Sequence, residues 1–107
     1  MGYGNLAKMA QQMQAEIARV QQEIEAMSLE GTAGGGAVKA VMNGKGEVVS
    51  ITLSKDVVDP DDLEMLQDLI TAAVNDAAHQ IKEASAQKMS AVTAGINIPG
   101  MPTGLIG

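Results

Sequence analysis

The sequence predicts an α+β protein in which one helix, three antiparallel strands and a second helix follow one another, an α–β–β–β–α protomer. Three observations lead to this prediction. Apolar residues recur at helical spacing near both ends of the 107-residue chain, they alternate with other residues in its middle, and Gly-rich turns separate the alternating segments. We expect a single domain over residues 1–94 and a Gly/Pro-rich flexible C-terminal tail over residues 95–107.

The first helix is expected from about Asn5 to Ser28, a stretch that contains no Gly or Pro. Its apolar residues are separated alternately by four and three positions, as in the seam of a heptad repeat. This seam consists of Leu6, Ala10, Met13, Ile17, Val20, Ile24 and Met27. A helix of about 24 residues is roughly 36 Å long, which exceeds the size of a compact domain of this length. A projecting seam would be exposed in a monomer, so we expect a homodimer.

A three-stranded antiparallel sheet with one buried face is expected between about Leu29 and Ser54. The Gly-rich stretch at 31–36 should lead from a short strand into a flexible loop, and Asn43-Gly44 is typical of a tight hairpin turn. In the second and third strands apolar residues occupy every other position: Val38, Ala40 and Met42, then Val49, Ile51 and Leu53. These two sets should form the buried face.

The second helix is expected to begin at Asp59-Pro60-Asp61-Asp62, with Asp59 as the N-cap and Pro60 in the first turn. The acids nearby suit the positive end of the helix dipole, so we interpret them as capping residues rather than as a calcium site, whose spacing is absent. The helix should run to about Val92. Its core stripe is Leu63, Leu66, Ile70, Ala73, Ala77, Ile81 and Ala84.

Several classes of function are excluded by residues that the sequence lacks. It has no Cys and a single His, His79, which lies opposite the core stripe of its helix, so no zinc site or Ser/His/Asp triad is expected within one chain. The glycines at 31–36 lack the Gly-Lys-Ser/Thr that a phosphate loop needs. We therefore expect no enzyme, no catalytic or metal-binding residues, no cofactor and no small-molecule substrate. No apolar run approaches the roughly 20 residues of a membrane span, and no signal peptide is apparent, which predicts a cytoplasmic protein without a membrane partner.

Four segments, in order along the chain, carry a resemblance to a known family. They are Gln11-Gln12-Met13-Gln14, Gly36-Ala37-Val38-Lys39-Ala40 with Asn43-Gly44, the block from Leu66 to Ala77, and Lys88-Met89 with Ile98-Pro99-Gly100. Together they resemble the YbaB/EbfC family of bacterial nucleoid-associated proteins, and the block ending in Asn-Asp-Ala is the most specific. The resemblance implies a tweezer-like homodimer whose helical arms contact DNA. It also implies a cytoplasmic, nucleoid-localised role in binding and bending DNA and influencing gene expression.

Four basic residues are the candidate DNA contacts. Lys8 and Arg19 lie about 20° apart around the first helix and away from its seam. Lys82 faces away from the core stripe of the second helix, and Lys88 lies close to its end. A dimer would repeat all four by two-fold symmetry, and phosphate contacts from them would give sequence-tolerant, salt-sensitive binding. No aromatic residue is placed to stack on bases, which favours double-stranded DNA over single strands.

The charge of the chain leaves other interpretations open. Seven Lys and Arg against 13 Asp and Glu give a net charge of −6, so DNA binding would depend on the local arrangement of charge. The helix ends contain few Lys and Arg compared with the family pattern, while Lys39 and Lys45 on the hairpin are weaker candidates. The four basic residues could also be an ordinary solvated surface beside Glu16 and Glu23. The alternative function is a dimeric protein-interaction scaffold or adaptor without direct nucleic-acid binding, whose partner would contact Met-rich helix surfaces.

Overall fold

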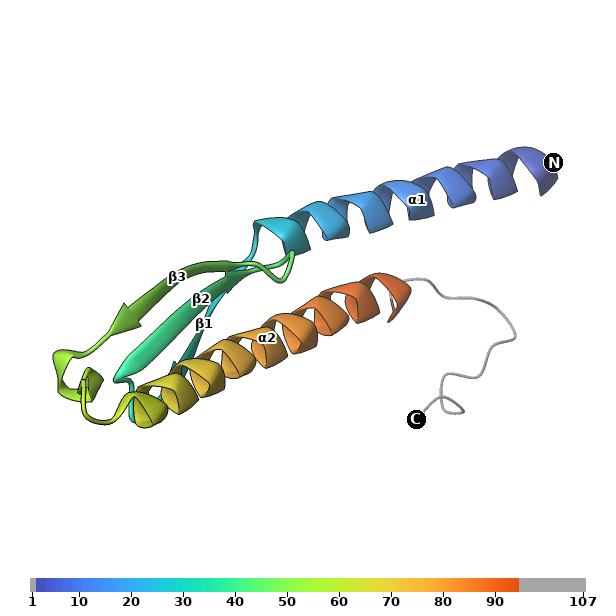
Figure 1. Cartoon of the computed structure of the whole chain (residues 1–107). Coiled ribbons are helices and arrows are strands. Elements are labelled where there is room, and N and C mark those ends of the chain that lie inside the picture. Colours follow the sequence, from blue (N-terminus) through green and yellow to red (C-terminus); the bar gives the residue numbers. More distant parts are fainter. Residues whose placement is uncertain (1, 95–107) are drawn as a thin grey trace.

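The predicted order of helices and strands is present in the computed structural model, which describes residues 2–94 (Figure 1). The elements are α1 (Gly2–Ala26), β1 (Ser28–Ala33), β2 (Val38–Asn43), β3 (Val48–Leu53), a short 3-10 helix η1 (Lys55–Val57) and α2 (Leu63–Ala94). The predicted α+β fold class is therefore confirmed. The tail expected over residues 95–107 lies outside the described residues.

The molecule is long and thin. Its extents are 74 × 27 × 15 Å and its radius of gyration is 20.4 Å, compared with about 13 Å for a compact domain of 100 residues. The sheet and the first half of α2 occupy one end, which we call the body (residues 27–78). From the body, α1 and the second half of α2 extend side by side, and we call residues 2–26 and 79–94 the arms (Figure 1).

The core lies between α2 and two strands of the sheet. The strand order is β1–β2–β3, with both pairs antiparallel, and α2 packs on β1 and β2. The side chains that meet there are buried: Val38, Ala40 and Met42 from β2, and Ala73, Ala77 and Ile81 from α2. Gly31 of β1 lies directly against the backbone of α2 at Ala73 and Ala77, where a Cβ atom would have no space. Small residues on both elements thus set how closely helix and sheet approach.

The expectation that β3 shares the buried face is wrong. Val49, Ile51 and Leu53 are exposed, at 60%, 42% and 38% of their surface, and every residue of the strand is exposed. The reason is that α2 covers β1 and β2, while β3 is the edge strand beyond them. A register shift at Val41/Met42 also places Met42 opposite Val48, which interrupts the alternation expected for β3.

The turn between β2 and β3 uses its glycines differently from the predicted hairpin. Gly46, with φ of 82°, is the residue in the left-handed region, whereas Gly44 has a negative φ. A Cβ at Gly44 would overlap the carbonyl oxygen of Ile24, and the Gly44 amide donates to the carbonyl of Met27 at 2.9 Å. Gly44 is therefore required because the end of α1 passes next to the turn.

The predicted N-cap of the second helix is also wrong, by three residues. Helix α2 begins at Leu63, and Asp62 caps it by accepting a hydrogen bond from the Met65 amide at 3.2 Å. Asp59 instead accepts from the Asp61 amide at 2.9 Å within a turn whose Asp62 amide donates to the Asp59 carbonyl. Both aspartates accept hydrogen bonds from local amides, but only Asp62 does so at the first turn of the helix.

The close approach of β1 and α2 leads to a first prediction. Replacing Gly31 with Ala should destabilise the fold by about 2 kcal/mol or more, because the added methyl group would overlap the Ala73 carbonyl and the Ala77 amide nitrogen. The midpoint of urea denaturation at a fixed protein concentration measures this effect. Gly4→Ala is the control, since a Cβ there meets nothing within 4 Å and Ala favours a helix. Equal midpoints for Gly31→Ala and the native chain would contradict the packing.

Candidate nucleic-acid interface

The seam of α1 is divided by the end of α2. Its C-terminal half packs within the chain: Val20 is buried, and Ile17, Ile24 and Met27 are half-buried. Met27 packs against the cluster of Met42, Ala77 and Ile81. The N-terminal half of the seam, namely Leu6, Ala10 and Met13, is exposed. The part of the seam nearest the body is therefore covered by the same chain, and only the distal part is exposed.

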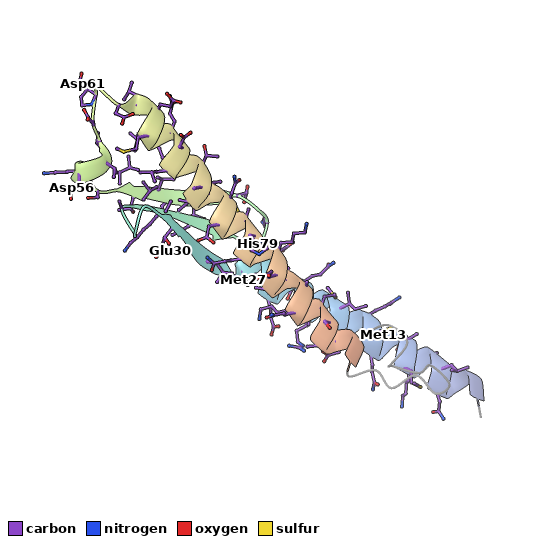
Figure 2. All side chains as sticks on the ribbon, turned by 90° about the horizontal axis from the view of Figure 1, so that it is seen from below. Met13, Met27, Glu30, Asp56, Asp61 and His79 are labelled. Carbon is purple, nitrogen blue, oxygen red and sulfur yellow. The ribbon has the colours of Figure 1, made fainter. Side chains whose placement is uncertain are left out.

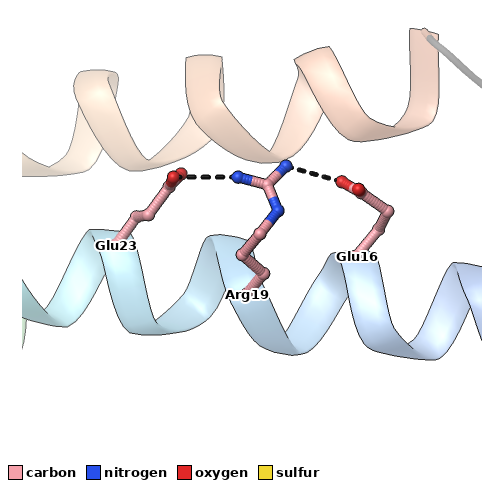
Figure 3. A network of polar contacts seen from close by, with 3 residues as sticks. All are labelled: Glu16, Arg19 and Glu23. Atoms are coloured by element: carbon pink, nitrogen blue, oxygen red, sulfur yellow. Dashed lines mark hydrogen bonds and ion pairs between the residues drawn. The ribbon is translucent and has the colours of Figure 1, made fainter.

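Arg19 is held by two carboxylates of its own helix. Its guanidinium donates to Glu16 at 2.6 Å and to Glu23 at 2.9 Å, and all three side chains point from α1 toward α2 (Figure 3). The hydrogen bond and charge of Glu16, followed by the charge of Glu23, raise the pKa of Arg19 above its ordinary value. These three groups together carry one net negative charge. A DNA phosphate would have to compete with both glutamates for this guanidinium.

Arg19 and Lys88 meet at one groove between the arms. It has a volume of about 260 Å³ and is lined by Glu16, Arg19, Val20 and Glu23 of α1 and by Lys88, Ala91 and Val92 of α2. Lys88 is half-buried there, whereas Lys8 and Lys82 are exposed elsewhere on the arms. At 1.5 Å per residue, Lys8 lies about 16 Å along α1 from Arg19, and Lys82 about 9 Å along α2 from Lys88. The structure thus brings together two of the four predicted contacts.

Charge is divided unevenly between the arms and the body. The arms contain four basic residues (Lys8, Arg19, Lys82 and Lys88) and four acidic ones (Glu16, Glu23, Glu25 and Glu83). The body contains three basic and nine acidic residues, so the whole net charge of −6 belongs to it. Asp56 and Asp61 lie at the end of the molecule opposite Met13 (Figure 2). A polyanion is therefore repelled from the body and much less from the arms. This division was not predicted from the sequence, because it depends on which residues belong to the arms and which to the body.

Two polar side chains attach α2 to β1 at the base of the arms. Asp76 accepts a hydrogen bond from the Thr32 amide at 2.9 Å, and Gln80 donates to the Glu30 carbonyl at 2.8 Å and to Asp76 at 3.3 Å. Asp76 therefore has a structural role, and Gln80 contributes to the same attachment. His79 is exposed, as predicted, and lies 3.3 Å from Glu83.

Residues 2–94 contain neither a helix that could span a membrane nor a cluster of metal ligands. None of the described helices is both long and apolar enough to cross a membrane. No group of three or more His, Asp or Glu in this range is arranged to hold a metal ion.

The fold and the arms define a class: small α+β proteins in which two antiparallel helices extend from one end of a three-stranded sheet. A family model described as the YbaB/EbfC DNA-binding family matches residues 1–96. This chain belongs to the YbaB/EbfC DNA-binding family, as the segments from Gln11 to Gly100 indicated.

Curated relatives agree with this assignment. A nucleoid-associated protein of Thermoanaerobacter pseudethanolicus is 53% identical over 97 residues, which cover 91% of this chain and 87% of the relative. A nucleoid-associated protein of Chloroflexus aurantiacus is 50% identical over 96 residues, covering 90% of this chain and 96% of the relative. The similarity extends over nearly the full length of both proteins.

A solved structure supports the fold. The crystal structure of an uncharacterized protein from Helicobacter pylori superposes with a TM-score of 0.70 at 22% sequence identity. The match covers 87% of this chain and 98% of the other. At this identity the comparison shows a common fold.

The attachment of α2 to β1 leads to a second prediction. Asp76→Ala should destabilise the fold by about 1–2 kcal/mol, because the Thr32 amide and the Gln80 side chain lose an acceptor. Thermal unfolding at a fixed protein concentration measures the loss. Asp68→Ala is the matched control, since Asp68 is an exposed acid on the same helix. If both variants unfold at the same temperature, the Asp76 contacts do not stabilise the helix.

Proposed function

We propose that two copies of this chain clamp duplex DNA between their arms, bend it, and thereby influence nucleoid organisation and gene expression in the cytoplasm. The division of charge is the observation that carries the proposal. With nine acids and three basic residues in the body, and equal numbers of each in the arms, a duplex approaches at the arms. Membership of the DNA-binding family and the names of the nucleoid-associated relatives support the same partner and location.

Lys8 and Lys82 are the first phosphate contacts in this proposal. Both are exposed on the arms, and phosphate contacts by Lys fix a protein on the duplex without reading its sequence. Lys88 and Arg19 are weaker phosphate contacts in this proposal, because the groove that they line is also lined by the acidic residues Glu16 and Glu23. The acids make Arg19 the weakest of the four, since its two ion pairs must be given up or shared. No catalytic step or cofactor forms part of the proposal.

A homodimer would place two such pairs of arms on one duplex. Its interface in this proposal is the exposed side of β3, which we call the β3 surface: Val48, Val49, Ile51 and Leu53, between 38% and 60% exposed. Natural edge strands are protected by charges, prolines or short length, but the six residues of β3 include no charge and no proline. A contiguous apolar surface of this kind is typical of an interface, and a two-fold axis pairs it with itself.

A third prediction tests DNA binding. Lys8→Gln should weaken binding of a random duplex and reduce the slope of log K against log salt by about 0.9 per lost contact, or about 1.8 per dimer. Mobility shift over a salt series measures both quantities. Lys55→Gln is the matched control, because it removes the same charge from an exposed residue of the body.

The outcomes separate the candidate functions. Equal losses for Lys8→Gln and Lys55→Gln would mean that the arms are not the contact surface. Salt-insensitive binding, or no shift with micromolar native protein, would contradict DNA clamping altogether. It would instead favour the scaffold function, in which a protein partner contacts the apolar surfaces.

A fourth prediction tests the dimer. Ile51→Lys should raise the dimer dissociation constant by about 100-fold, because an unpaired charge would be buried beside its copy across the two-fold axis. Sedimentation velocity over a concentration series measures the constant. Thr52→Lys is the control: Thr52 pairs with Lys39, on the face of the sheet away from α2. A native chain that stays monomeric at micromolar concentration, or equal effects of the two variants, would contradict the proposed interface.

A further inference from the structure

A second apolar surface lies on the distal part of α1, far from β3. Leu6 and Met9 are 63% and 60% exposed, Met13 is 37% exposed, and Ala10 is exposed between them. At 100° per residue these four side chains fall within an arc of about 100°. We call them the α1 stripe. They continue the line of Ile17, Val20 and Ile24, which are half-buried or buried where α1 runs beside α2 (Figure 1). The same face of the helix is therefore exposed only in its distal part.

The cover ends where α2 ends. Ala91 and Val92 line the groove with Glu16, Arg19 and Val20, so the last turns of α2 lie level with that part of α1. The two helices run in opposite directions, so the C-terminal end of α2 points the same way as the N-terminal end of α1 (Figure 1). Measured along α1 from Glu16, Met13 is about 5 Å away and Leu6 about 15 Å away. The uncovered stripe therefore begins beside the point from which residues 95–107 start.

The sequence of residues 95–107 suits this surface. These thirteen residues contain no charged side chain and five large apolar ones: Ile96, Ile98, Met101, Leu105 and Ile106. An extended chain advances about 3.3 Å per residue, so five residues span the roughly 15 Å of the stripe and thirteen exceed it. Ile96 and Ile98 would lie on one side of an extended segment about 6.6 Å apart, which is close to the 5.4 Å pitch of the helix beneath.

We propose that residues 95–107 dock along the α1 stripe of the same chain, continuing the cover that α2 provides. Ile96 and Ile98 are the anchoring side chains, seated over Met13, Ala10 and Met9. Attachment to Ala94 favours this occupant over a second copy or another protein, because a short tether gives an effective concentration in the millimolar range. Docking leaves Lys8 uncovered, since it is about 200° from Leu6 around the helix, so the inference does not depend on DNA binding.

Disulfide trapping in the full chain tests the docking. Because the sequence has no native Cys, the two introduced residues are the only ones that can form a disulfide within one chain. We expect Met9→Cys/Ile98→Cys to form an intramolecular disulfide at least five times faster than Gln11→Cys/Ile98→Cys. Gln11 is exposed two residues from Met9 but about 200° around the helix. Non-reducing electrophoresis and mass spectrometry of dilute protein identify the products. Equal rates for the two pairs, or disulfides formed between chains instead of within one, would overturn the proposal.

Methionine oxidation provides a measurement without introduced Cys. Hydrogen peroxide should oxidise Met13 at least three times faster in Ile96→Asp/Ile98→Asp than in the native chain, because the anchors no longer cover it. Met65, which is 36% exposed on the body, is the internal reference and should oxidise equally in both. Unchanged oxidation of Met13 would overturn the docking even if the Cys variants failed to fold.

Discussion

The contact between Gly31 of β1 and the backbone of α2 at Ala73 and Ala77 is the constraint on which the architecture depends. Three small residues allow helix and strand to approach at backbone distance, and Asp76 and Gln80 fix the same pair of elements by hydrogen bonds. A helix of 32 residues placed in this way covers two strands and then continues beyond the sheet. Both the exposed edge strand β3 and the arms are consequences of that placement.

The arms are stabilised by packing along one face and remain polar on the others. Val20 is buried against α2, while Glu16, Arg19, Glu23 and Lys88 surround the groove beside it. Exposed ion pairs of this kind contribute little stability, so burial of the apolar seam mainly stabilises the packing of α1 against α2. The charged groups mainly determine the local electrostatic potential. That potential distinguishes the nearly neutral arms from the acidic body, and an acidic protein can therefore belong to a DNA-binding family.

Helical spacing predicts some contacts of the candidate site, and the others depend on how α1 and α2 are placed relative to each other. Glu16 and Glu23 lie three and four residues from Arg19 on α1, so their proximity follows from helical spacing, whereas the geometry of the two ion pairs does not. The meeting of Arg19 with Lys88 was not foreseeable, because it depends on how α2 crosses the sheet. The exposure of Val49, Ile51 and Leu53 was mispredicted for the same reason. Alternation within a strand shows which residues share a face, but not whether a helix covers that face.

The sequence by itself determined the local structure: the heptad spacing of α1, the alternation of β2, the Gly-rich turns and the family resemblance all depend on neighbouring residues. It therefore predicted the α+β class, the order of the elements and the buried stripe at Ala73 and Ala77. Only the tertiary structure decided that α2 stops short of β3, that the seam is covered from Ile17 onward and exposed before it, and that the acids gather at one end. These outcomes depend on the relative placement of whole elements. That placement follows from the backbone contact at Gly31, which joins residues more than 40 positions apart.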